Sequence, residues 1–159
     1  MSRHDTSLRE RIADFQAAYI RSIDTDQLEA WPNFFAEDCQ YTVTTSENFH
    51  QGLPAGLIWA NNRAMLEDRV SALRHANVYE RHSYRHIVGQ SYVVQSHEQT
   101  AQVETPFMVA RIIHDGWTDL YCTGCYHDTF ELRDDGLLLR QRIVVCDSNR
   151  IDTLLAIPL

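Results

Sequence analysis

Apolar residues recur at helical spacing near the start of the chain. One stripe, in which each member follows the last after three or four positions, consists of Leu8, Ile12, Phe15 and Tyr19. Such spacing is typical of the buried face of an α-helix. It predicts a helix that begins near Thr6 or Ser7, either of which can cap it, and ends near Asp24. A short second helix is expected from Asp26 to Trp31, because Pro32 lacks the N–H that an α-helix needs.

The next segment combines one strand with a second amphipathic helix. A tight connection, residues 33–38, is expected to lead into a strand over Cys39–Thr45, in which apolar and polar side chains alternate. A loop follows that contains Gly52, Pro54 and Gly56. The helix expected after this loop runs from Asn61 to His75. Its apolar face consists of Leu66, Val70 and Leu73.

The second half of the chain has the pattern of an antiparallel sheet. The expected strands are Ile87–Val88 continued by Tyr92–Val94, then Thr100–Ile113, Trp117–Arg133 and Leu137–Cys146. Gly89 is expected to mark a bulge in the first of them. Asp115-Gly116 and Asp135-Gly136 are hairpin signals, because glycine tolerates the positive φ of tight turns. The pattern predicts an α+β fold, in which a strongly curved antiparallel meander packs on the amino-terminal helices.

Composition indicates one ordinary globular domain, residues 1–159. Hydrophobic residues make up 44% of the 159 residues, enough for a single core without crosslinks. The formal net charge is −8 and all 14 basic residues are arginine. This acidic balance argues against nucleic-acid binding, which needs clustered positive charge. No run of about 20 apolar residues predicts a membrane span, and the polar start predicts no signal peptide, so a cytoplasmic location is expected.

Four cysteines raise the question of a redox or metal centre. They are Cys39, Cys122, Cys125 and Cys146. Cys122 and Cys125 form a C-x-x-C motif, but it lies in an expected strand, where positions three apart point to opposite faces. The cysteines are therefore expected to be reduced thiols, as is usual in the cytoplasm.

One pattern comes close to the ligand set of a Rieske iron–sulfur cluster, which combines two cysteines with two histidines. Cys125 and His127 match the first half of that set. The second half would begin at Cys146, but Asn149 stands where the imidazole is required. The sequence therefore predicts no cluster in this chain.

The most chemically crowded stretch is residues 79–86. Glu80, His82 and His86 supply the two-histidine, one-carboxylate set of a mononuclear iron site. Arg81 and Arg85 lie between them, and their positive charge would weaken the binding of a dication. We favour a strand entry whose arginine and histidine side chains make internal or interface contacts.

A second candidate set consists of Asp38, Tyr41 and His86. In a cone-shaped fold they could meet as a general acid–base group, since histidine titrates near neutral pH. The spacing does not require this, and buried polar residues that satisfy one another are more common. The sequence has no GxGxxG, GxxxxGKS/T or GxSxG motif, so dinucleotide, P-loop and hydrolase sites are not indicated.

Short segments over nearly the full length carry a family resemblance. They are Asp24-Thr-Asp26, Trp31-Pro-Asn-Phe-Phe35, Asp38-Cys-Gln-Tyr41, Met65-Leu-Glu-Asp-Arg69, Tyr79-Glu-Arg-His82, Tyr84-Arg-His-Ile-Val-Gly89, Thr105-Pro-Phe-Met-Val109, Gly124-Cys-Tyr126, Cys146-Asp-Ser148 and Ile157-Pro-Leu159. Together they resemble the small (beta) subunits of Rieske non-haem-iron aromatic-ring-hydroxylating dioxygenases. The resemblance implies a cone of the nuclear transport factor 2-like (cystatin-like) type.

The resemblance also implies a role in a larger assembly. In this family a large (alpha) subunit holds the Rieske 2Fe–2S cluster and a mononuclear iron, and three large subunits join a trimer of small subunits. The complex uses O2, and electrons from NADH that a separate reductase delivers, to cis-dihydroxylate an aromatic carboxylate, here expected to be terephthalate. The small subunit is expected to be non-catalytic and to hold no cofactor or metal.

Six residues are expected at interfaces with the neighbouring subunits. They are Arg81, His82, Arg85, His86, Asp147 and Leu159. The first four combine charged and aromatic groups, and the last two bound a segment with an apolar end that needs cover.

Two other functions are compatible with the same cone. One is a stand-alone dehydratase or isomerase that uses Asp38, Tyr41 and His86. It should lose activity on His86→Ala while staying folded. The other is a module that binds a small aromatic ligand without turnover. A structural subunit should instead co-purify with a larger iron protein.

Overall fold

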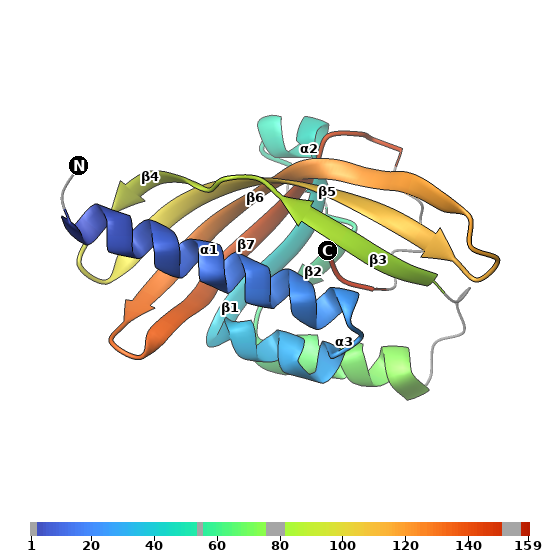
Figure 1. Ribbon diagram of the computed structural model, residues 1–159, viewed down its shortest axis with the longest axis horizontal. Helices are drawn as coiled ribbons and strands as arrows, with labels where there is room; N and C mark the ends of the chain where they lie inside the picture. The colour runs from blue at the N-terminus through green and yellow to red at the C-terminus, as the bar shows by residue number, and fades with distance from the viewer. Residues whose placement is uncertain (1–2, 54–55, 76–81, 151–156) are drawn as a thin grey trace.

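A single curved sheet carries its three longer helical segments on one face, and a fourth, short helix lies near an edge of the sheet. The computed structural model describes residues 3–53, 56–75, 82–150 and 157–159. Figure 1 shows helix α1 lying across one face of the sheet, with α3 packed beside the short 3-10 helix η1. The helices are α1 (Arg3–Asp24), η1 (Leu28–Phe34), α2 (Ser46–His50) and α3 (Arg63–His75).

The strands form one seven-stranded sheet. They are β1 (Phe35–Thr45), β2 (Ile58–Ala60), β3 (His82–Val88), β4 (Tyr92–Ser96), β5 (Thr100–Ile113), β6 (Thr118–Arg133) and β7 (Gly136–Cys146). Their order is β2-β1-β7-β6-β5-β3, and β4 also pairs with β5. The predicted α+β fold with amino-terminal helices on a curved sheet is confirmed.

The predicted stripe of α1 is its buried face. All four members are at most 9% exposed, and Ile23 extends the stripe by one more turn. The helix begins at Arg3, before the predicted start near Thr6. It ends through Asp26, a left-handed residue with φ of 59°. The amides of Asp26 and Gln27 bond back to the carbonyls of Ile23 and Ser22, at 3.1 and 2.8 Å, which closes the last turn.

The predicted meander is confirmed in β5, β6 and β7. Each pair is antiparallel and joined by a tight turn. Gly116 and Gly136 have φ of 90° and 153°, which explains the glycine at each turn.

One pair of strands departs from the antiparallel expectation. β1 runs parallel to β7, with Tyr41 opposite Arg142 and Val43 opposite Val144. The chain leaves β1 through α2, β2 and α3 and forms four strands before β7 returns beside β1 in the same direction. The sheet is therefore mixed. No tight turn joins β1 to β7, so the hairpin signals in the sequence say nothing about the direction in which these two strands pair.

The strand expected around Gly89 is two strands. β3 and β4 both pair with β5, through Val88 opposite Phe107 and Tyr92 opposite Glu104. At the break a Cβ on Gly89 would lie 2.8 Å from Pro106 Cγ. Because glycine has no Cβ, the main chain at residue 89 can lie this close to Pro106, and the strand is interrupted at this point.

Several element boundaries differ from the prediction. The short helix is a 3-10 helix that continues through Pro32, and β1 begins at Phe35, inside the expected connection. The expected loop contains α2 and β2. α3 begins later than predicted because Asn62 caps it, its Oδ1 accepting a hydrogen bond from the amide of Met65 at 2.9 Å.

The core lies between the sheet and the helices. It unites the α1 stripe with the inward side chains of every long strand and with Ile157 and Leu159 near the end of the chain. No helix among the described residues is long and apolar enough to cross a membrane.

Candidate functional site

A buried ion pair lies at the centre of the cone. Arg142 on β7 and Asp128 on β6 stand directly opposite each other, and neither side chain is exposed. The guanidinium donates to the carboxylate through both Nε and Nη2, each at 2.8 Å. Two parallel charge-assisted bonds offset part of the cost of taking both charges out of water.

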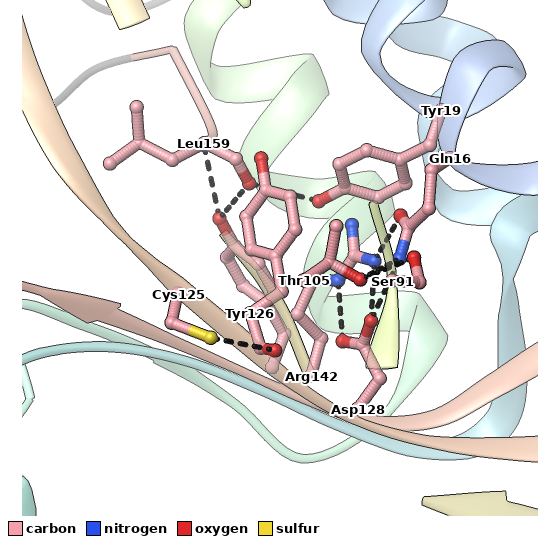
Figure 2. A network of polar contacts seen from close by, with 10 residues as sticks. Gln16, Tyr19, Ser91, Thr105, Cys125, Tyr126, Asp128, Arg142 and Leu159 are labelled. Atoms are coloured by element: carbon pink, nitrogen blue, oxygen red, sulfur yellow. Dashed lines mark hydrogen bonds and ion pairs between the residues drawn. The ribbon is translucent and has the colours of Figure 1, made fainter. Parts of the chain in front are cut away.

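Helix α1 joins this pair through Gln16. Its Oε1 accepts from Arg142 Nη2 at 2.6 Å, and its Nε2 donates to Asp128 Oδ2 at 3.0 Å. The same Nε2 reaches Thr105 Oγ1 at 3.3 Å, and Thr105 is bonded to Ser91 at 2.7 Å. Figure 2 shows these side chains converging from the helix and the sheet. The network fixes α1 on β5, β6 and β7.

Two tyrosine rings enclose the Arg142 guanidinium. Its carbon lies 4.1 Å from the ring centre of Tyr19 and 4.0 Å from that of Tyr126. Burial opposes the charge of Arg142, but the Asp128 carboxylate outweighs it and the pKa of Arg142 stays above its ordinary value. Burial also raises the pKa of both tyrosines, so their hydroxyls stay protonated and can donate.

Residue Leu159 closes the inside of the cone. Its carbonyl oxygen accepts from the hydroxyls of Tyr19 at 2.9 Å and Tyr41 at 3.0 Å. Its amide donates to the Tyr41 hydroxyl at 3.1 Å. The leucine side chain is 0% exposed, so the residue is held by both its polar and its apolar parts.

A second buried pair links the end of α1 to β3. The carboxylate of Asp24 accepts from His86 Nδ1 at 2.6 Å and from the His86 amide at 2.8 Å. The His86 side chain is 0% exposed and that of Asp24 is 4% exposed. The carboxylate fixes the orientation of the ring, and the other nitrogen, Nε2, is buried without a partner among the described residues.

The candidate acid–base set of Asp38, Tyr41 and His86 does not come together. Tyr41 and His86 point into the cone, but Asp38 lies on the outer face of β1, beside Gln40 and Gln141. Alternation along a strand explains this, because Asp38 is an odd number of positions from Tyr41. The carboxylate that meets His86 is that of Asp24, a residue that the sequence pattern places at the end of a helix and in no candidate site.

Comparison with known proteins places the chain in a family. The model of the ring hydroxylating beta subunit matches residues 19–153. The chain belongs to the beta subunits of aromatic-ring-hydroxylating dioxygenases. The terminal oxygenase component subunit beta 2 of terephthalate 1,2-dioxygenase from Comamonas sp is 50% identical over 149 residues, which are 94% of this chain and 97% of that protein. The anthranilate 1,2-dioxygenase small subunit of Burkholderia cepacia is 40% identical over 144 residues, which are 91% of this chain and 89% of that protein.

A solved structure agrees with the fold of this beta subunit. The beta subunit assigned to an aromatic-ring-hydroxylating dioxygenase of Novosphingobium aromaticivorans has a TM-score of 0.90 and is 37% identical, covering 98% of this chain and 99% of that one. The predicted family and the predicted cone of the nuclear transport factor 2-like type are both confirmed.

The beta subunit's own residues do not fit a Rieske cluster. Cys122 is buried on the inner face of β6 and Cys125 is half-buried on the outer face, as the strand parity predicts. Asn149, which stands where a cluster would need a histidine, donates a hydrogen bond from its Nδ2 to Glu47 Oε2 at 2.5 Å. Across residues 3–53, 56–75, 82–150 and 157–159, no three His, Cys, Asp or Glu side chains gather as a metal site would require.

The residues expected at subunit interfaces lie in different places. Arg81, like Glu80 of the iron-site hypothesis, falls outside the described residues. Arg85 and Asp147 are exposed and His82 is partly exposed. The side chains of His86 and Leu159 are enclosed by this chain. The interface role of all six stays a prediction.

The four cysteines are free thiols, and one of them supplies a test of the outer face. Burial and the nearby Glu104 carboxylate raise the pKa of Cys125 to about 11. At pH 8 its thiolate fraction, and hence its reaction with iodoacetamide, is expected to be about 100-fold below that of the unfolded chain. Mass spectrometry of labelled Cys125 would measure this rate. Glu104→Gln should raise it, whereas equal rates in native and unfolded protein would contradict the assignment.

Proposed function

We propose that this chain is the non-catalytic small subunit of an oxygenase that cis-dihydroxylates an aromatic carboxylate, with terephthalate as the substrate. The observation that carries the proposal is the 50% identity to a terephthalate 1,2-dioxygenase beta subunit across nearly both full lengths. The alignment covers 94% of this chain and 97% of that protein, so few residues remain outside it that could form an additional site. The substrate would bind to the partner subunit, where chemistry takes place.

The redox groups of the reaction belong, on this proposal, to a large (alpha) subunit. That subunit would hold the Rieske cluster and the mononuclear iron, and a reductase would pass it electrons from NADH. The described residues of the beta subunit support this division, because their donor sets fit neither group. Three beta subunits would form the trimer on which the large subunits assemble in the cytoplasm.

The outer face of β3 and β5 suits a subunit contact. Ile87 and Met108 are directly opposite and are 58% and 44% exposed. Arg85, two positions before Ile87, points to the same face and makes no ion pair with another described residue. Exposed apolar residues around one arginine are typical of the centre of an interface.

Purification of the tagged chain from its native host tests the proposal. We expect a complex of several large and small subunits that contains iron, and an iron-free beta subunit after dissociation. Native mass spectrometry and metal analysis would measure both. An iron-free oligomer of this chain alone would contradict the proposal and favour a stand-alone enzyme that uses the buried Asp24 and His86 pair.

Arg85→Ala tests the contact surface within that complex. We expect the variant to co-purify with less of the large subunit or as a smaller oligomer, because an interface arginine contributes about 2 kcal/mol or more when well packed. Arg140→Ala is the matched control, since Arg140 is an exposed arginine whose ion pair with Glu131, at 3.3 Å, lies within the described part of this chain. An unchanged native mass in Arg85→Ala would exclude this face as a contact.

A further inference from the structure

The inside of the cone holds Leu159 in the way that a protein holds a ligand. Two tyrosine hydroxyls donate to one carbonyl oxygen, and one of them also accepts from the leucine amide. These hydroxyls come from α1 and β1, far from residue 159 in sequence. The apolar side chain fills the core among the aromatic residues beside them. A small-molecule site likewise combines a few polar groups with apolar surroundings, as the hydroxyls and the core residues do here.

Two donors of the same buried cluster have no partner among the described residues. Arg142 Nη1 and the Tyr126 hydroxyl are buried and have no hydrogen-bond partner among the described residues. Figure 2 shows Tyr126 reaching from the sheet toward Leu159, beside Tyr19. Buried polar groups are nearly always paired, so spare donors inside the cone indicate that its interior can bind more oxygen atoms than residue 159 supplies.

We propose that the cone interior is an acyl-binding site, occupied by residues 157–159, that takes a small carboxylic acid with an apolar body when this segment withdraws. The hydroxyls of Tyr19 and Tyr41 would donate to one carboxylate oxygen. The Tyr126 hydroxyl and Arg142 Nη1 would donate to the other carboxylate oxygen. Asp128 already balances the charge of Arg142, so the site selects by donors and shape more than by net charge. Residues 157–159 then act as an internal competitor of the ligand.

This inference goes beyond the role of the beta subunit in the oxygenase and does not depend on it. Benzoate is the probe, measured by isothermal titration calorimetry on the intact chain and on a chain that ends at residue 156. We expect the shortened chain to bind benzoate with a Kd of about 1 mM or tighter. The intact chain should bind at least about tenfold more weakly, because its own segment competes.

Two tyrosine substitutions in the shortened chain locate the site. Tyr41→Phe should weaken benzoate binding about fivefold, as expected for one lost hydrogen bond. Tyr92→Phe is the matched control, since Tyr92 is 67% exposed on β4, and it should leave the affinity unchanged. A folded shortened chain that takes up no benzoate, or one that is indifferent to Tyr41→Phe, would overturn the proposal.

Leu159→Gly in the full chain decides the matter if the shortened chain does not fold. This variant keeps the main-chain hydrogen bonds and removes only the apolar filling. Saturating benzene should then raise the thermal midpoint of the variant by about 2 °C or more and leave the parent protein unchanged, since an apolar ligand stabilises the state whose cavity it fills. No shift in the folded variant would show that residue 159 fills no ligand-sized pocket.

Discussion

Arg142→Ala is expected to lower the free energy of unfolding of the beta subunit by about 3–5 kcal/mol. The substitution leaves the Asp128 carboxylate buried without its counter-charge, and Gln16 alone cannot replace it. It also removes the group that lies between the rings of Tyr19 and Tyr126. Urea denaturation followed by circular dichroism measures the loss.

Two further variants separate this charge effect from simple loss of volume. Arg140→Ala, two residues away on the exposed side of β7, should cost less than about 1 kcal/mol because exposed ion pairs contribute little. The double variant Arg142→Met/Asp128→Leu should recover much of the loss, since a buried pair can often be replaced by apolar groups of similar size. A single Arg142→Ala variant within 1 kcal/mol of the parent would show that Asp128 finds another partner or water.

The buried network could have been found from the sequence by strand parity. Tyr126, Asp128 and Phe130 are alternate residues of one predicted strand, so a charged side chain at 128 must share the inward face with two aromatic residues. Arg142 and Val144 are likewise alternate residues of the next strand, so the Arg142 side chain shares the inward face with Val144. The register set by the hairpin turn alone would place Asp128 opposite Gln141. A bulge between Thr129 and Phe130 shifts it by one residue and brings Asp128 opposite Arg142, and the sequence does not indicate this bulge. Gln16 was also inferable, because it follows Ile12 by four positions and precedes Tyr19 by three, which places it on the buried stripe of α1.

Contacts between distant segments were beyond the sequence pattern. The pairing of Asp24 with His86 depends on how far α1 extends before its left-handed end at Asp26. The parallel pairing of β1 with β7 joins strands about 100 positions apart, for which neither segment carries a local signal. The position of Leu159 inside the cone is also a contact between distant segments that the local sequence pattern does not predict. An apolar end predicts burial, but it does not say whether the cover is the chain itself or a neighbouring subunit.

The second large effect is expected at Gly124, which opposes Cys146 in the β6 and β7 pair. A Cβ at this position would lie 2.1 Å from the carbonyl oxygen of Val145 and 3.0 Å from the ring of Phe107. The obstacle is mainly a backbone atom held in the sheet, so a rotamer change cannot relieve it. We expect Gly124→Ala to cost about 3 kcal/mol or more, at or above the upper end for overpacking. Thermal and urea denaturation would measure it.

The two contacts of Gly124 can be told apart by a second substitution. In Gly124→Ala/Phe107→Leu the smaller side chain clears the space near the ring but leaves the Val145 carbonyl in place. The double variant should therefore stay strongly destabilised relative to Phe107→Leu alone. Thr123→Ala, on the outer face one residue earlier, is the control, and it loses only an exposed hydrogen bond to Asp147. Full rescue by Phe107→Leu would mean that the sheet yields at the carbonyl and that ring packing alone required the glycine. Persistent loss would mean that the close approach of β6 to β7 requires it, and that this approach sets the curvature on which the cone depends.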